Sequence, residues 1–300
     1  MTASTQAAVD KKSRSTSGFS HKKLNFFGVI GSEFLKFRTL TTNWVMSIIV
    51  VLLMVGLALA FASSLNLYLE ALKEQAAAQA GQRGGDFGDM TLDSINNYAL
   101  HLGASGVSLA SMLVGSLAVV FIGSEYATRS IQSTITAVPK RSLVFLAKLL
   151  TLSFYSFVLG FILAAASYRL GTLILDQEIR DSAPFGDTVV YSWLAVAIYF
   201  MLMAWMGFGF GSLIRNNAGG IVCVVICMFI LPIILGLLGL GIEWIKDFQP
   251  YLPSALGDVM TGFEQGSDDI GQKEAGLWFG LWAAVPALLG YLRFRFTDSK

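Results

Sequence analysis

The chain alternates between long apolar runs and short polar segments. Within the runs the apolar residues are continuous and do not alternate with polar ones, as they would in the strands of a membrane barrel. A helix needs about 20 mainly apolar residues to cross a hydrocarbon core about 30 Å thick, and six runs reach or approach this length. Helices are favoured because unpaired backbone groups are costly in lipid. The expected spans are residues 44–62, 105–122, 148–168, 190–212, 218–240 and 276–292.

The segments between the runs differ in length and charge. Only a few residues around Arg215 separate the fourth and fifth runs, so we expect those two spans to be antiparallel neighbours. Two connections, 63–104 and 241–275, are long and acidic. The first opens with LNLYLEALKEQAAAQA, whose Ala, Leu, Glu and Lys content favours a helix, and GQRGGDFGD then interrupts it. Prolines break the second connection into short pieces.

Composition agrees with this all-helical membrane interpretation, because 54% of the residues are hydrophobic and 14% are charged. No segment is long enough for a separate soluble domain, so we expect one membrane domain over 23–300. Residues 1–22 contain no apolar run, and we expect them to form a disordered cytoplasmic tail and not a signal peptide.

Charge is distributed unevenly between the two sides of the expected membrane domain. With the N-terminus in the cytoplasm, the cytoplasmic segments hold 15 of the 21 Lys and Arg residues, and the outer segments hold 16 of the 20 Asp and Glu residues. Lys and Arg are retained on the cytoplasmic side of membranes, so we expect both termini to lie in the cytoplasm. The net charge of +1 conceals this asymmetry and gives no indication of nucleic-acid binding.

Several kinds of chemistry are excluded by what the sequence lacks. It has no G-x-x-x-x-G-K-[ST] loop, so the chain does not bind ATP in the P-loop manner. His21 and His101 are expected on opposite sides of the membrane, which excludes a bis-histidine haem. No charged residue lies near the middle of an expected span, where ion-coupled carriers usually place one. Cys223 and Cys227, four residues apart in an apolar run, are interpreted as structural thiols. We therefore expect no catalytic residue, metal or cofactor in this chain.

Small residues recur within the second apolar run at Ser108, Ser111 and Gly115. Such residues let helix backbones approach closely, which favours ordinary packing within one subunit. The alternative interpretation makes this polar face part of a transport pathway or of a dimer contact. The sequence leaves both open.

The segment SEYATRSIQSTITAVPKRS, residues 124–142, is charged and lies between two apolar runs. We expect a short helix over 125–137, with Glu125 favourably near its positive end and Pro139 excluding further helix. Ile131 and Ile135 fall on one side of it, which predicts an amphipathic cytoplasmic helix. Lys140, Arg141 and Lys148 are expected to reach lipid headgroups. The alternative is an interfacial turn that only anchors two helices.

This segment resembles the signature of ABC type-2, exporter-class permeases, particularly their small actinobacterial subunits. The matching residues are Glu125, Tyr126, Ile131, Thr134, Pro139, Arg141 and Lys148. Arg129 departs from the pattern, because such sequences often carry glycine close to this position.

Three further stretches are similar to the same family, and the resemblance covers roughly residues 30 to 295. SLIRNNAGG resembles its short inner turn, and YLPSALG resembles its outer loop before the last span. SEFLKFRTLTTNW resembles the motif before its first span, with Glu33, Lys36 and Arg38 in place. An apolar stripe at three- to four-residue intervals predicts a helix over 25–40 in the inner membrane interface; it consists of Leu24, Phe27, Ile30, Phe34 and Phe37.

The resemblance implies a permease subunit in a bacterial cell membrane. It would pair with a second copy or a homologue and with two ATPase subunits, which hold ATP and Mg²⁺. The helix over 125–137 would be the coupling helix, with Glu125 and Arg129 in polar docking, Ile131 and Ile135 seating the helix, and Arg141 fixing its angle. The helix over 25–40 would be the second contact.

The expected cargo is amphipathic or lipophilic, such as an antibiotic, a peptide or a lipid, because the span interiors are uncharged. Compact outer loops and the lack of a substrate-protein docking domain resemble exporters. A different class remains open, in which the chain is a non-transporting membrane scaffold or immunity protein. A self-sufficient channel would need rings of polar or charged groups, which the expected spans lack.

Overall fold

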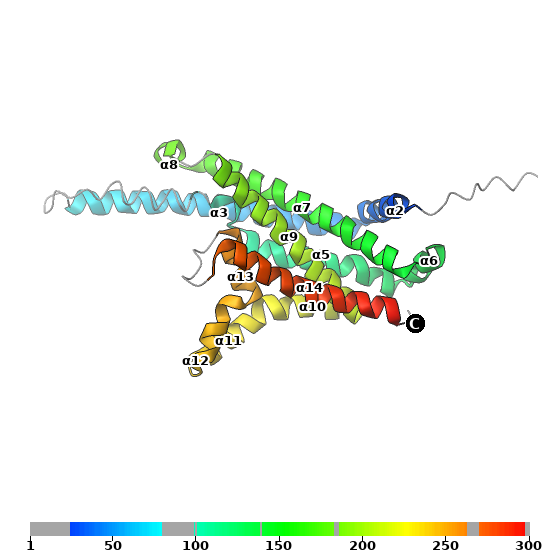
Figure 1. Ribbon diagram of the computed structural model, residues 1–300. Coiled ribbons are helices and arrows are strands. Elements are labelled where there is room, and N and C mark those ends of the chain that lie inside the picture. Colours follow the sequence, from blue (N-terminus) through cyan, green and yellow to red (C-terminus); the bar gives the residue numbers. More distant parts are fainter. Residues whose placement is uncertain are drawn as a thin grey trace, which may run out of the picture.

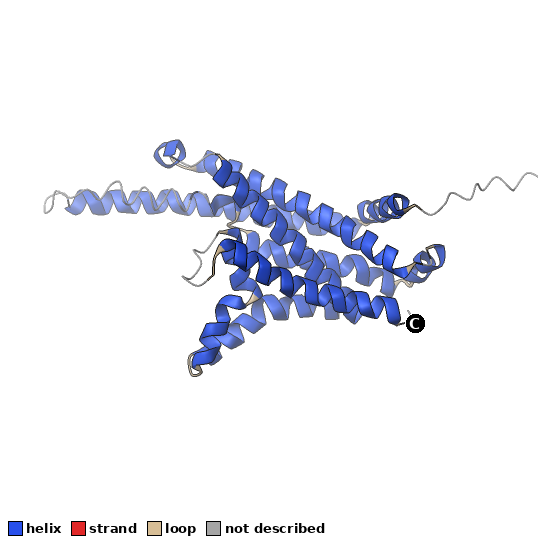
Figure 2. Ribbon diagram, in the orientation of Figure 1, coloured by secondary structure: helices blue, strands red, loops and turns tan. Residues whose placement is uncertain are grey.

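The computed structural model describes residues 25–79, 99, 101–138, 140–182, 186–262 and 270–297. Every regular element in these residues is a helix (Figures 1 and 2). The tail expected over 1–22, the GQRGGDFGD segment and Pro139 lie outside the described residues. The elements are α2 (Phe26–Thr39), α3 (Thr41–Gln79), η1 (His101–Gly103), α5 (Val107–Ala127), α6 (Ser130–Ala137), α7 (Arg141–Ile174), α8 (Gln177–Ser182), α9 (Asp187–Ile214), α10 (Asn217–Val225), η2 (Ile226–Ile230), α11 (Leu231–Gly239), α12 (Glu243–Phe248), η3 (Gln249–Tyr251), α13 (Pro253–Thr261) and α14 (Gln272–Phe296).

In the described residues, six helical segments are long and apolar enough to cross a membrane, which agrees with the expected multi-pass membrane protein. Each of them coincides with one of the expected apolar runs. They are Thr41–Glu74, His101–Ala127, Arg141–Ile174, Asp187–Ile214, Asn217–Gly239 and Gln272–Phe296.

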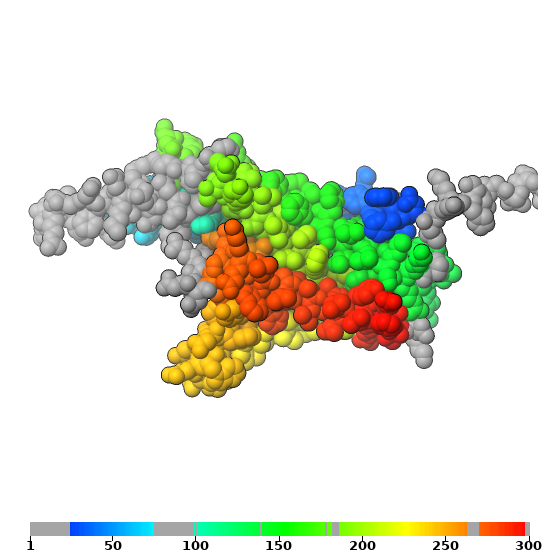
Figure 3. Space-filling view, in the orientation of Figure 1, coloured from blue at the N-terminus to red at the C-terminus, as the bar shows by residue number. Residues whose placement is uncertain are grey.

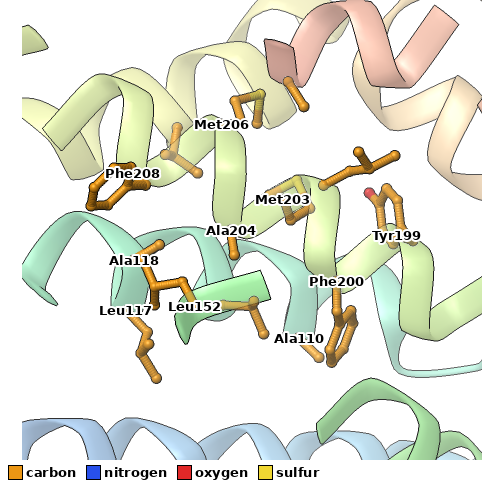
Figure 4. Close-up of a cluster of buried hydrophobic side chains, with 14 of the residues drawn as sticks. Ala110, Leu117, Ala118, Leu152, Tyr199, Phe200, Met203, Ala204, Met206 and Phe208 are labelled. Atoms are coloured by element: carbon orange, nitrogen blue, oxygen red, sulfur yellow. The ribbon is translucent and has the colours of Figure 1, made fainter. Parts of the chain in front are cut away.

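Helix α9 lies at the centre of the bundle and packs against α5, α7 and α14. Met203 and Phe208 of α9 lie in one buried cluster with Ala118 of α5 and Leu152 of α7 (Figure 4). Gly207 lets α9 approach α5 closely, because a Cβ atom there would overlap the backbone of Gly115. Close backbone approach at small residues is how membrane helices pack without a hydrophobic driving force between them.

The fifth span is interrupted and lies mostly outside the core. Only 11% of its most apolar window is buried, compared with 72% for the second span. It consists of α10, a π-helical turn η2 and α11, which begins beside Pro232. Proline lacks a backbone N–H, and π turns accommodate such breaks in the hydrogen-bond ladder. From this point α11 and α12 project away from the bundle (Figures 1 and 3).

Helix α3 projects beyond the other helices at the end of the bundle that also carries α8 and α12 (Figure 1). It is helical as far as Gln79, which confirms the helix predicted for most of LNLYLEALKEQAAAQA. Asn66 ties α3 to the end of α7, because its amide donates to the Ile174 carbonyl and accepts from the Asp176 N–H. The opposite end carries α2, α6 and the last turn of α14, and is called the α6 end below.

Candidate functional site

A cluster of four charged side chains lies at the α6 end, and three of them, Glu33, Glu125 and Lys148, are buried. Lys148 Nζ is 2.5 Å from Glu33 Oε2 and 2.5 Å from Glu125 Oε1. Lys36 Nζ is 3.1 Å from Glu33 Oε1 and 3.5 Å from Glu125 Oε1. The side chains of Lys148 and Glu33 are 0% and 1% exposed. Two lysines and two glutamates balance their charges, as burial of ionised groups requires.

The cluster joins three elements that are distant in sequence. Glu33 and Lys36 belong to α2, Glu125 to the last turn of α5, and Lys148 to α7. Lys148 Nζ also lies 5.1 Å from the centre of the Phe121 ring. Movement of one of these three helices would therefore disturb contacts with the other two.

The expectation that Lys148 reaches lipid headgroups is wrong. This lysine lies about two turns into α7, on the face that turns toward the bundle together with the buried residues Val144 and Phe145. Its long side chain reaches two carboxylates inside the protein instead of the membrane surface.

The predicted start of the short helix at Glu125 is also wrong. Helix α5 continues to Ala127, and α6 begins only at Ser130, after Arg129 in the left-handed conformation. Glu125 therefore lies at the negative end of α5 and not at the positive end of α6. A carboxylate is disfavoured there, and the ammonium groups of Lys148 and Lys36 compensate for it.

Helix α6 is amphipathic, as predicted for this segment. Ile131 is buried, and Ile135 packs against the same hydrophobic core. Gln132, Ser133 and Thr136 are exposed on the outward side. Lys36 Nζ of α2 donates to Thr134 Oγ1 of α6 at 3.0 Å. The two helices that the sequence analysis singled out are thus in direct contact.

Helix α2 presents a different face to the bundle from the predicted stripe. Val29, Glu33 and Phe37 are buried, whereas Phe27 and Phe34 are exposed. The stripe is therefore divided between two sides of the helix, because Phe37 packs inward on Phe121 and Tyr155.

Arg38, the remaining candidate on α2, lies in its last turn. The side chain of Arg38 is exposed, and its carbonyl accepts from Trp44 Nε1 at 2.8 Å.

Two arginines connect the ends of α9 and α14 at the same end of the molecule. Arg215 Nη2 donates to the carbonyls of Arg293 and Thr297, at 3.3 and 3.1 Å. Arg293 in turn donates to the carbonyl of Leu213. The guanidinium group of Arg215 also lies 5.3 Å from the centre of the Tyr126 ring. The candidate Arg141 approaches this assembly, with Nη1 3.5 Å from the Thr297 carbonyl.

The small-residue face of the second span turns toward other elements of the same chain. Ser108 donates to Asp258 Oδ1 of α13 at 2.7 Å, and Ser111 lies 3.5 Å from the hydroxyl of Tyr199. Gly115 packs closely against Met203 of α9. These contacts agree with the interpretation as packing within one subunit.

Sequence reasoning did not identify the cluster itself. Its signal was present, because charged residues are scarce in the chain and Glu33, Glu125 and Lys148 all fall within the motifs quoted for the family resemblance. Within the described ranges, no group of His, Cys, Asp and Glu side chains could hold a metal ion.

No protein-family model and no curated protein matches this chain. Its function is therefore inferred from its own residues and their geometry.

Proposed function

We propose that this chain is the membrane subunit of an ATP-driven ABC exporter. Six membrane-spanning helices supply the transmembrane part, and separate ATPase subunits would supply the energy. In this proposal α6 is the coupling helix, and the α6 end faces the cytoplasm of a bacterial cell. The expected partners are two ATPase subunits holding ATP and Mg²⁺, a second permease copy or homologue, and membrane lipid.

The charged cluster is the observation that carries this proposal. A force on α6 would reach α2 through the hydrogen bond between Thr134 and Lys36. It would reach α5 and α7 through Glu125 and Lys148. Helix α5 packs closely on the central helix α9. Displacement of α6 by an ATPase subunit would therefore be transmitted into the spans.

The roles of individual residues follow from their burial. Glu125 is part of the joint between helices and is not available for docking, which leaves Arg129 for that role. Ile131 and Ile135 seat α6 on the bundle. Arg141 helps to fix the start of α7 against the end of α14. An amphipathic or lipophilic cargo remains the expectation, because the span interiors contain no mid-span charge.

A bulky substitution on the outward face of α6 tests the proposal. The ATPase subunit that co-purifies with the wild-type chain is purified and reconstituted with it in liposomes. Ser133→Trp places an indole on the exposed face, so we expect loss of ATPase co-purification and of ATP-dependent transport of amphipathic dyes. Within the described part of the chain, the Ser133 hydroxyl bonds only to the Ser130 carbonyl of its own helix, so folding should be preserved.

Thr188→Trp is the matched control, because Thr188 is an exposed hydroxyl residue of α9 at the opposite end of the molecule. It should leave both measurements unchanged. If the chain performs its role in the membrane with no ATPase subunit bound to it, the proposal is contradicted and the scaffold or immunity protein is favoured.

A further inference from the structure

Two residues other than glycine have positive φ angles in the described chain, and both are arginines. Arg129 has φ 57° and lies between α5 and α6, and Arg215 has φ 59° and ends α9. Left-handed backbone is unfavourable for residues with a Cβ atom, and glycine adopts it without this penalty. We therefore expect an arginine at such a position to form side-chain interactions that compensate for the unfavourable backbone conformation.

The side chain of Arg215 forms such interactions within the chain. Its guanidinium group bonds the carbonyls of Arg293 and Thr297 and lies over the ring of Tyr126. Arg129 is different, because its side chain is exposed and its guanidinium group forms no hydrogen bond or ion pair with any described residue. Strained residues of this kind cluster at functional sites.

The outward face of α6 itself, next to Arg129, carries no charged side chain. Helix α6 contains no charged residue, and the hydroxyl groups of Thr128 and Ser130, on either side of Arg129, lie 3.0 Å apart and form a hydrogen bond. Thr128 donates to the Ser124 carbonyl, and Thr136 donates to the Gln132 carbonyl. At the start of α6, the exposed guanidinium group of Arg129 therefore lies beside neutral polar groups.

We propose that Arg129 forms an ion pair with a carboxylate of the ATPase subunit and thereby selects which ATPase this permease accepts; this inference rests on the proposed function. A guanidinium group binds a carboxylate in a planar, bidentate arrangement. A protein surface suits α6 better than a lipid headgroup does. A helix that lies on a membrane buries its apolar face in lipid, whereas the isoleucines of α6 face the bundle.

Arg129→Gly separates this role from a structural one. Glycine relieves the left-handed backbone, so the melting temperature of the variant should equal or exceed that of the wild type. We nevertheless expect its affinity for the purified ATPase subunit to fall at least about tenfold, because the carboxylate of the ATPase subunit would be buried in the complex without its cation. Arg129→Lys should retain part of the affinity, and binding by the wild type should weaken more steeply with salt than binding by Arg129→Gly.

Arg215→Gly is the matched control, because it removes an arginine from the same backbone conformation but breaks contacts within the chain. It should lower the melting temperature. Unchanged ATPase affinity in a stable Arg129→Gly variant would overturn the inference. So would an affinity loss that occurs in liposomes with anionic lipid but not in purely zwitterionic ones, which would assign Arg129 to a headgroup. If the wild type binds no ATPase, the proposed function fails as well.

Discussion

The ammonium group of Lys148 is enclosed by protein, and its charge is compatible with burial because two carboxylates contact it at 2.5 Å. The same geometry makes each glutamate dependent on the lysine. Glu33 would retain only Lys36, whose side chain is 39% exposed and thus partly screened by water. The balance of charge within this cluster therefore depends mainly on Lys148.

Lys148→Met should destabilise the protein by about 3–5 kcal/mol, because two buried carboxylates would then share only the partly exposed Lys36 as a cation. The free energy of unfolding in mixed detergent micelles measures this. Lys140→Met is the control, since Lys140 is exposed, and it should change stability by less than about 0.5 kcal/mol. Replacing the cluster by apolar residues, with Glu33→Leu and Glu125→Leu added to Lys148→Met, should recover much of the loss. Full stability of Lys148→Met alone would show that the cluster contributes nothing.

Helix contacts divide the molecule into tightly and loosely packed parts. Helices α5, α7 and α14 all pack on α9, whereas the substantial contacts of α11 are limited to η2, α12 and η3, which lie close to it in the sequence. At the α6 end, Arg215 and Arg293 bond the last carbonyls of each other's helices. Cations at helix C-termini are favoured by the helix dipole, so these bonds strengthen the union of α9 and α14.

Gly207→Ala should separate α5 from α9, because the added Cβ atom would lie 2.7 Å from the carbonyl carbon of Gly115. Overpacking of this kind costs about 1–3 kcal/mol. Gly56→Ala is the matched control in α3, where a Cβ atom would meet nothing within 4 Å. It should leave the unfolding free energy unchanged or slightly increased. Equal effects of the two substitutions in the same unfolding assay would contradict the close approach at Gly207.

In the molecule as a whole, the sequence was sufficient for the number and position of the spans, because each apolar run is long enough to require a helix. The sequence did not predict which groups surround individual charged side chains. Lys148 looked like an interfacial lysine because the rotation of α7 that directs it inward depends on tertiary packing. Glu125 looked like the start of a helix because nothing local predicts that α5 continues to Ala127. The break in the fifth span at η2 lies beside Pro232, which is visible in the sequence. The sequence does not show that α11 projects away from the bundle beyond this break.

Crosslinking from α6 tests most directly whether an ATPase docks there. Cys223 and Cys227 are replaced by serine, and Ser133→Cys then carries a short photoactivatable crosslinker in intact membranes. Thr188→Cys, at the opposite end of the molecule, serves as the control. The account predicts a covalent adduct with an ATP-binding subunit from position 133 and none from position 188, with a yield that changes when ATP is added. Absence of an ATPase adduct at position 133, or equal adducts at both positions, would contradict it.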